Sequence, residues 1–291
     1  MTRKAGTCWR VFRSAVANTV NHDGIEHAGY LAFLGLLALF PFLVFMVSVI
    51  GFIGQGEAGE RLIAEALSVL PEHVTAALKP RVVEIISGPP QGLLTVAILG
   101  AIWTASSAVE GIRTVLNRAY HVTTPPAYWL RRSLSVLQLL IFTAILITAM
   151  LALVFLPIVL ANIERWLGIA LMDGSDHELG RLVIWLAVGA IFAAVSYIYY
   201  TIPNIKQSFI AVWPGALVVV VLWLSAANLF TMYLSNFNQV NLIYGSLGGI
   251  IAALLFFYIC NVIFIFGAEL NYEITRALGL RVVEREHGAD R

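Results

Sequence analysis

The chain has 291 residues, of which 59% are hydrophobic and 12% are charged, with a formal net charge of +1. Ordinary globular chains carry about 25% charged residues, so this composition excludes an ordinary soluble domain. Cys8 lies before the apolar segments and Cys260 lies inside one of them. We therefore expect neither a disulfide between them nor a metal site built on cysteine.

The first segment, residues 1–27, is short and polar. Trp9, Phe12, Val16 and Val20 recur in it at helical spacing. This pattern predicts an interfacial helix that lies on the inner leaflet, and a cytosolic tail helix is the alternative. The apolar run that follows is too long for the core of a cleaved signal peptide, so we expect it to stay in the chain as an anchor.

Uncharged runs that are long enough to cross a bilayer follow along the chain. A transmembrane helix needs about 20 apolar residues, and the longest run, 207–268, has room for two helices on either side of a polar stretch at 235–241. Barrel strands are about 10 residues long and alternate in polarity, which these runs do not. We therefore predict an all-α polytopic membrane protein. Its six predicted spans are residues 28–54, 92–118, 133–163, 182–202, 209–234 and 242–270.

The six spans form one predicted transmembrane domain, residues 28–271, and a cytosolic tail follows at 272–291. With the N-terminus inside, the inner segments hold 13 of the 18 Lys and Arg residues. Cytoplasmic loops are enriched in these residues, so both termini are predicted to be cytoplasmic. The basic residues flank the helices and form no separate cluster, so we expect membrane lipids as partners and no nucleic acid.

The longest outer connection, residues 55–91, repeats apolar residues at spacings of three and four. The pattern predicts amphipathic helices on the outer face, which either cover a cavity or pack against lipid headgroups. At 54–59 the spacing matches G-x-G-x-x-G. A dinucleotide site needs a short strand before that motif, whereas a long apolar run precedes it here, so we expect no nucleotide or other cofactor.

Four ionisable residues cluster just before the first span: His22, Asp23, Glu26 and His27. On a helix, Asp23 and His27 lie four residues apart and could share a metal ion. The spacing fits neither H-E-x-x-H nor H-x-x-E-H. We therefore interpret the cluster as a solvated helix start and predict no metal site.

Small residues and prolines mark predicted packing and kink sites. Gly245 and Gly249 lie on one stripe of the sixth span, which predicts close helix packing within the chain. Pro41 in the first span and Pro214-Gly215 in the fifth are predicted kinks, where freed carbonyl groups can line a cavity.

Polar side chains within or beside the spans are the candidate functional residues. A carboxylate in lipid is costly unless it is paired or hydrated. For Glu110 and Glu269, one interpretation is an ion pair, with Arg113 or Arg118 as available partners, and the other is a substrate or proton path. The full candidate set is Trp103, Thr104, Ser106, Glu110, Asn117, Asn204, Asn228, Tyr244, Glu269 and Asn271.

Four passages together resemble the YihY/BrkB family of bacterial inner-membrane proteins. They are 28–33 with 39–41, 103–106 with 117–120, 202–204 with 213–216, and 244–248 with 267–271. The resemblance implies a multi-pass protein of the bacterial inner membrane with six helices and both termini in the cytoplasm. The family has carried the labels virulence factor and tRNA-processing ribonuclease. The second label conflicts with the residues, which predict no metal site and no basic nucleic-acid face.

No Ser-His-Asp set, paired acid or Walker loop is present in the sequence, so we predict no enzymatic activity. The kink sites, the polar groups at depth and the outer amphipathic segment predict a transporter or a protein that handles lipids or other envelope components. A non-transporting scaffold that binds a partner is the alternative. The sequence leaves the oligomeric state open.

Overall fold

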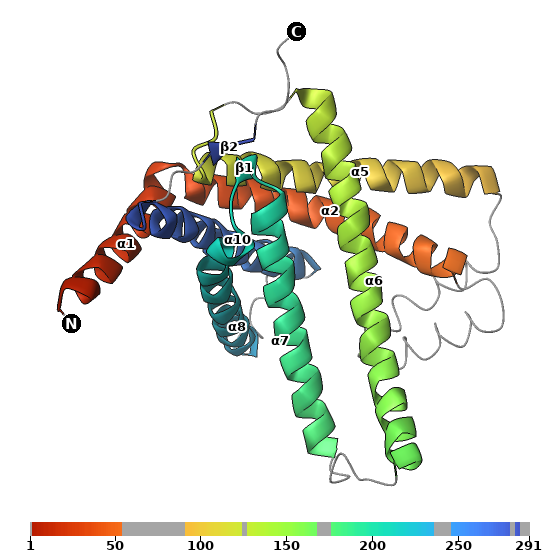
Figure 1. Ribbon diagram of the computed structural model, residues 1–291. Coiled ribbons are helices and arrows are strands. Elements are labelled where there is room, and N and C mark those ends of the chain that lie inside the picture. The colour runs from red at the N-terminus through yellow and green to blue at the C-terminus, as the bar shows by residue number, and fades with distance from the viewer. Residues whose placement is uncertain are drawn as a thin grey trace. The chain divides into compact units, whose positions relative to one another are not determined.

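The computed structural model describes residues 2–53, 91–123, 127–167, 176–235, 246–279 and 283–285. Long helices dominate these residues, as the composition predicts (Figure 1). The helices are α1 (Thr2–Asn21), α2 (Gly24–Ile53), α5 (Gln91–Ala119), α6 (Tyr128–Leu167), α7 (Asp176–Thr201), α8 (Trp213–Ser235) and α10 (Ser246–Ala277). The described elements also include a 3-10 helix, η1 (Phe209–Val212), and two short strands, β1 (Ile205–Lys206) and β2 (Val283–Glu284).

Four apolar helical segments within the described residues are long enough to cross a membrane. They are Tyr128–Thr148, Ile184–Thr201, Phe209–Leu234 and Gly248–Ala277, and they confirm the third to sixth predicted spans as apolar helices. The first two predicted spans coincide with α2 and α5, of which α2 contributes a shorter apolar stretch, Gly24–Leu39. The total of six spans and the orientation of the termini stay predictions.

Contacts within the chain divide it into two compact units. Unit 1 comprises Met1–Ala38, Ser107–Ser135 and Ile191–Arg291, and unit 2 comprises Leu39–Ser106 and Val136–Ala190. The division points fall inside α2, α5, α6 and α7, so each of these helices contributes to both units. The candidate site described below lies within unit 1.

Helix α1 has an exposed apolar stripe and a buried side. Trp9, Phe12, Val16 and Val20 are all exposed, and Ala15 on the other side is buried. The helix packs against α10. An exposed apolar stripe beside a helix that is long and apolar enough to cross a membrane suits contact with lipid, and the interfacial location stays a prediction.

The helices α8 and α10 approach each other closely at two glycines of unit 1. A methyl group on Gly215 would lie 2.2 Å from the carbonyl oxygen of Gly267, and one on Gly267 would lie 2.3 Å from Val219 Cγ2. Gly249, for which we predicted close packing, is exposed, and a methyl group there would meet no atom within 4 Å. The prediction of close packing is therefore wrong for Gly249, and the close approach on α10 is instead at Gly267. The other predicted glycine, Gly245, is outside the described residues.

Of the two predicted proline kinks, the one at Pro214 differs from the structure. Pro214 occupies the first turn of α8, directly after η1. A proline in a first turn removes no helical hydrogen bond, so it starts the helix rather than bending it. Pro41 does lie inside a helix, and α2 continues through it as far as Ile53.

The C-terminal region is more structured than a simple tail. Helix α10 extends to Ala277, seven residues beyond the predicted end of the sixth span at 270. Strand β2 then pairs antiparallel with β1, with Ile205 opposite Glu284 and Lys206 opposite Val283. The predicted amphipathic helices at 55–91, including the glycine-rich motif, lie almost entirely outside the described residues.

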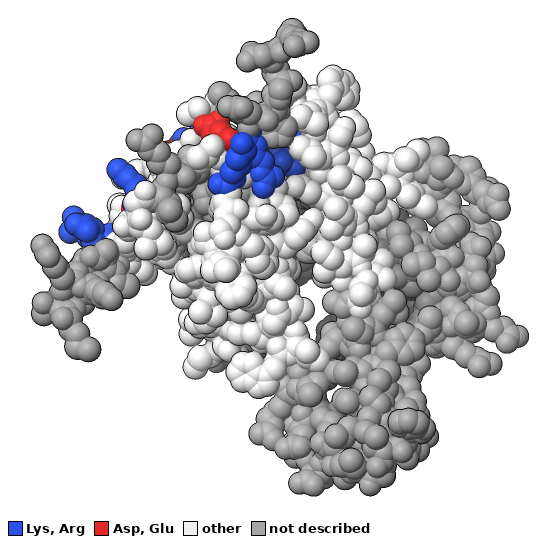
Figure 2. Space-filling model, viewed as in Figure 1, with Lys and Arg blue, Asp and Glu red and all other residues white. Residues whose placement is uncertain are grey.

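Charged side chains are unevenly distributed on the surface. On the face shown in Figure 2, those of the described residues lie toward one edge, and the rest of the described surface is uncharged. Helix α8 has no Asp, Glu, Lys or Arg along its length. An uncharged helical surface is what a lipid environment requires.

Candidate functional site

A buried arginine in the C-terminal half of α5 joins three helices of unit 1. The Arg113 side chain is 4% exposed, and its Nη1 donates to the carbonyl oxygen of Ile202, just after α7, at 2.9 Å. Glu110 Oε2 lies 3.5 Å from Arg113 Nε and accepts a hydrogen bond from Ser135 Oγ of α6 at 2.9 Å. The buried charge therefore has partners on α5, on α6 and at the end of α7, which fixes these elements relative to one another.

Glu110 lies between two arginines. Its Oε1 is 3.4 Å from Nε of Arg131 in α6, and its Oε2 faces Arg113. Of the two interpretations of Glu110, the described residues bear out the ion pair, with Arg113 as the partner. Arg118 pairs instead with Asp23. A role for Glu110 in a substrate or proton path stays a prediction.

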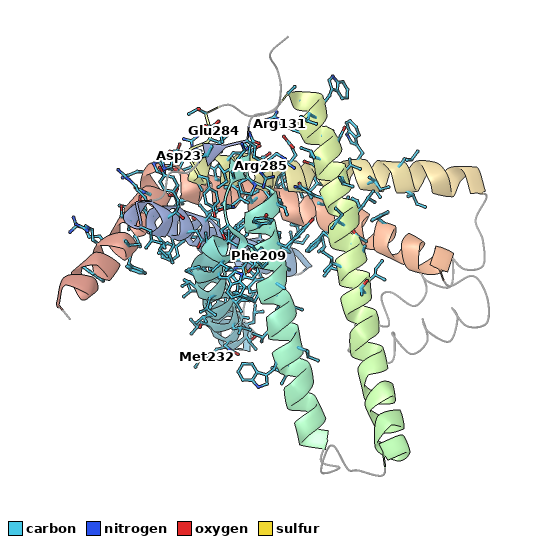
Figure 3. The ribbon with its side chains drawn as sticks, in the orientation of Figure 1. Asp23, Arg131, Phe209, Met232, Glu284 and Arg285 are labelled. Atoms are coloured by element: carbon cyan, nitrogen blue, oxygen red, sulfur yellow. The ribbon has the colours of Figure 1, made fainter. Side chains whose placement is uncertain are left out.

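Two predicted asparagines meet at the connection between α7 and η1. The backbone N–H of Asn204 donates to Asn117 Oδ1 at 2.8 Å, and both side chains are buried. The carbonyl oxygen of Asn204 accepts the N–H of Arg285 at 3.1 Å. Buried backbone without helical hydrogen bonds needs other partners, and α5 and the C-terminal strand region supply them. Figure 3 shows Arg131, Glu284 and Arg285 near the same end of unit 1, and Met232 of α8 away from it.

A third predicted asparagine, Asn271 of α10, holds the start of α8. Its Oδ1 accepts the N–H of Gly215 at 2.7 Å, and its Nδ2 donates to the carbonyl oxygen of Val212 at 3.0 Å. The Asn271 side chain is 1% exposed. The first N–H groups of a helix have no partner within the helix, so this amide satisfies one of them from a neighbouring helix.

Three side chains that are distant in sequence converge at one point of unit 1, and we call them the histidine cluster: His22, His121 and Glu269. His22 Nδ1 lies 2.9 Å from Glu269 Oε1. The rings of His22 and His121 meet edge to face with centroids 4.6 Å apart. One nitrogen or oxygen from each of the three side chains lies within 4.8 Å of the others.

The members of the histidine cluster differ in burial. Glu269 is 1% exposed, His22 has a side chain that is 29% exposed, and His121 is exposed. Glu269 Oε2 is buried and has no hydrogen-bond partner among the described residues. The cluster therefore runs from a buried carboxylate to a histidine at the surface, with one carboxylate oxygen unsatisfied.

Both histidines lie in turns beside helix ends. His22 precedes Asp23, which has a φ of 55°, in the turn between α1 and α2, and His121 has a φ of 55° just after α5. This left-handed conformation is uncommon for residues other than glycine, although Asp and His adopt it more readily than most. The ion pair between Asp23 and Arg118 links the first turn to the end of α5.

The surroundings of His121 favour its neutral form. Partial burial, and then the nearby His22, lower the pKa of His121 below its ordinary value. Its ring also lies against Tyr272, with centroids 4.4 Å apart. A neutral imidazole has one nitrogen with a free lone pair, so His121 at neutral pH can accept a hydrogen bond or bind a metal ion.

The ionisable residues that the sequence grouped together have different side-chain partners in the structure. Of the four, only His22 belongs to the histidine cluster. Asp23 pairs with Arg118, His27 Nδ1 lies 2.6 Å from the Asp23 carbonyl oxygen, and Glu26 is exposed. The sequence analysis missed His121. The signal that could have indicated it was its position three residues after the predicted second span, on the side predicted to be cytoplasmic, as for His22.

The other predicted candidates do not belong to this cluster or lie outside the described residues. Trp103, Thr104 and Ser106 belong to unit 2, where Ser106 is fully buried and donates to the Trp103 carbonyl oxygen at 3.0 Å. Asn228 is exposed on α8. Tyr244 is not among the described residues.

Comparisons with known proteins agree with the resemblance seen in the sequence. The profile of the family described as Virulence factor BrkB matches residues 15–290. A ribonuclease-like protein of Bacillus subtilis (strain 168), YfkH, is 29% identical over 217 residues, which cover 71% of this chain and 76% of that protein.

Shorter matches reach proteins that are named only as membrane proteins. A UPF0761 membrane protein of Vibrio cholerae is 33% identical over 106 residues, covering 36% of this chain and 33% of that protein. One of Vibrio vulnificus is 34% identical over 107 residues, covering 37% and 32%. These matches span about a third of the length of the Vibrio proteins. No solved structure matches the chain. Because the family profile covers nearly all of its residues, the chain belongs to the BrkB (YihY) family of membrane proteins.

Proposed function

We propose that this protein transports a polar or charged solute, or a lipid, across the bacterial inner membrane, and that Glu269 lies on the path. The observation that carries the proposal is the burial of this carboxylate within the apolar segment Gly248–Ala277, with one oxygen unpaired among the described residues. Ionisable residues inside membrane spans are costly and rare, and they commonly mark substrate or ion paths.

A purely structural role for Glu269 is supported less well. A carboxylate kept only to hold helices together would be expected to have both oxygens hydrogen-bonded, because buried polar atoms without partners are destabilising. Both oxygens of Glu110 have charged partners, since each faces an arginine, and Oε2 also accepts a hydrogen bond from Ser135. The contrast between the two carboxylates separates a structural ion pair from a candidate path residue.

The uncharged sequence before Glu269 limits the kinds of groups that a substrate would meet on the path. Residues 207–268 contain no charged side chain, so a substrate that passes them would meet amides, hydroxyls and backbone groups. The buried amide of Asn271, two residues after Glu269, is already committed to Gly215 and Val212. Glu269 itself is therefore the group on α10 that we expect to contact the substrate or a coupled ion.

Transport can be tested with the purified protein in vesicles, by following labelled solutes of each charge class and fluorescent lipids. We expect Glu269→Gln to reduce movement at least tenfold while the protein stays folded. The matched control is Glu26→Gln, the same change at an exposed carboxylate, which should leave movement unchanged. Movement that is equal in wild type and Glu269→Gln would exclude Glu269 from the path. A stoichiometric co-purifying partner, with no movement of any solute or lipid, would favour the scaffold instead.

A further inference from the structure

We propose that the histidine cluster is a binding site for a divalent transition-metal ion, of which Zn²⁺ is the representative. His22 and His121 offer two imidazole nitrogens and Glu269 offers a carboxylate oxygen, all within 4.8 Å of one another. Two histidines and one glutamate are a common ligand set for zinc ions that keep an open coordination position. The proposal goes beyond the proposed function, because the site can bind metal whether or not the protein moves a solute.

The spacing of the ligand atoms suits one shared ion. A tetrahedral ion with ligands at about 2.0–2.1 Å holds the ligand atoms about 3.3 Å apart. His22 Nδ1 and Glu269 Oε1 are 2.9 Å apart, close to that separation. No two ligand atoms of the cluster are more than 4.8 Å apart. The widest separation therefore has to shorten by about 1.5 Å, and small side-chain rotations provide that change.

Charge balance at Glu269 also favours a cation. Among the described residues its ion-pair partner is His22, which is charged only when protonated. The carboxylate one turn later, Glu273, accepts from Asn18 Nδ2 at 2.9 Å and lies 3.7 Å from Arg276 Nη1, so it has partners of its own. A buried charge needs compensation, and a metal ion bound to the carboxylate would neutralise the charge of Glu269.

The donor atoms select the class of metal. Mg²⁺ and Ca²⁺ prefer all-oxygen sites, whereas imidazole nitrogen favours Zn²⁺, Co²⁺, Ni²⁺ and Cu²⁺. His121 is exposed, so a water molecule can reach the fourth coordination position. Tyr272 packs on the His121 ring, with centroids 4.4 Å apart, and so limits the rotation of this ligand.

The experiment measures metal binding directly, with full-length protein in detergent, without a polyhistidine tag and stripped of metal by a chelator. Equilibrium dialysis against Zn²⁺ followed by elemental analysis gives the stoichiometry. The absorption spectrum of bound Co²⁺ reports the coordination number and the presence of nitrogen ligands. We expect one ion per chain in the wild type.

His121→Asn is the decisive variant, because asparagine tolerates the left-handed backbone at this position and the side chain is exposed. We expect it to weaken Zn²⁺ binding by about 100-fold or more, since the loss of a direct ligand should exceed the 10–100-fold effect of losing a supporting contact. His22→Gln keeps a hydrogen-bond donor for Glu269 and should weaken binding similarly. His27→Gln is the matched control and should bind as the wild type does.

Two results would overturn the proposal: no stoichiometric Zn²⁺ on the wild type, or equal binding by wild type and His121→Asn. Either would leave the cluster as a histidine–carboxylate ion pair. The measurement involves no transport, so a protein that binds Zn²⁺ through this cluster but moves no solute would uphold the metal site and refute the proposed function. Transport without metal binding would refute the metal site and leave the proposed function standing.

Discussion

Asn271 accepts the backbone N–H of Gly215 at 2.7 Å, although 56 residues separate the two positions in the chain. The same amide donates to the carbonyl oxygen of Val212. Both partners flank the point where the 3-10 helix η1 becomes α8. One side chain of α10 therefore sets where and how the neighbouring helix begins.

Replacing this amide should destabilise unit 1 markedly. Asn271→Leu would leave the N–H of Gly215 and the carbonyl of Val212 buried without their partner, at a cost of about 1–3 kcal/mol each. We expect a clear fall in the thermal unfolding midpoint of the detergent-solubilised protein. Asn228→Leu makes the same change at an exposed position and should have little effect. Equal midpoints for the two variants would contradict the importance of the Asn271 bonds.

The close approach of α8 and α10 should not tolerate a methyl group at Gly215. In Gly215→Ala the new Cβ would meet the Gly267 carbonyl oxygen at 2.2 Å and Asn271 Cγ at 2.6 Å. Overpacking of this kind costs about 1–3 kcal/mol or more, so we expect a lower unfolding midpoint. Gly249→Ala is the control, because its methyl group meets no atom within 4 Å. A stable Gly215→Ala protein would show that the two helices can separate without loss.

Arg113 and Arg118 should respond differently to the same substitution. A lysine at position 113 cannot reproduce the planar donor arrangement that reaches both Ile202 and Ser135, and we expect a loss of about 1–3 kcal/mol. Arg118 pairs with Asp23 where both side chains are about half exposed, so Arg118→Lys should cost at most about 1 kcal/mol. Unfolding midpoints of the two lysine variants test this, and the prediction fails if Arg118→Lys is the more damaging.

The predicted orientation can be tested by cysteine labelling in a background that lacks Cys8 and Cys260. A cysteine in place of Asn238, between the fifth and sixth predicted spans, should react with a membrane-impermeant reagent added outside intact cells. A cysteine in place of Ser208, two residues after Lys206, should react only after the membrane is opened. These outcomes follow from the excess of Lys and Arg in the segments assigned to the cytoplasm. The reverse pattern would invert the orientation of the whole protein.

The apolar spans were the most predictable part of the fold. The described segment Phe209–Leu234 has the same limits as the predicted fifth span, because a membrane helix is specified locally by the absence of charge over about 20 residues. Pro214 was harder to interpret. Its effect depends on where the helix begins, and Asn271 on another helix contributes to setting that point.

The candidate site was predictable only in part. Glu269, Asn271, Asn117 and Asn204 stood out as polar residues at or near predicted span ends, and the structure buries all four. Their partners could not be inferred, because His22 and Glu269 are 247 positions apart. Local spacing instead grouped His22 with Asp23 and His27. A single sequence carries no information about which distant turns meet.

The pairing of β1 with β2 has a consequence for the order of assembly during synthesis. The Asn204 side chain donates to the Arg285 carbonyl oxygen, 81 residues further along the chain, at 3.4 Å. Both α8 and α10 are translated between these two residues. The buried connection after α7 therefore leaves the ribosome before its final partners, and this part of unit 1 can be completed only after α8 and α10 have been synthesised.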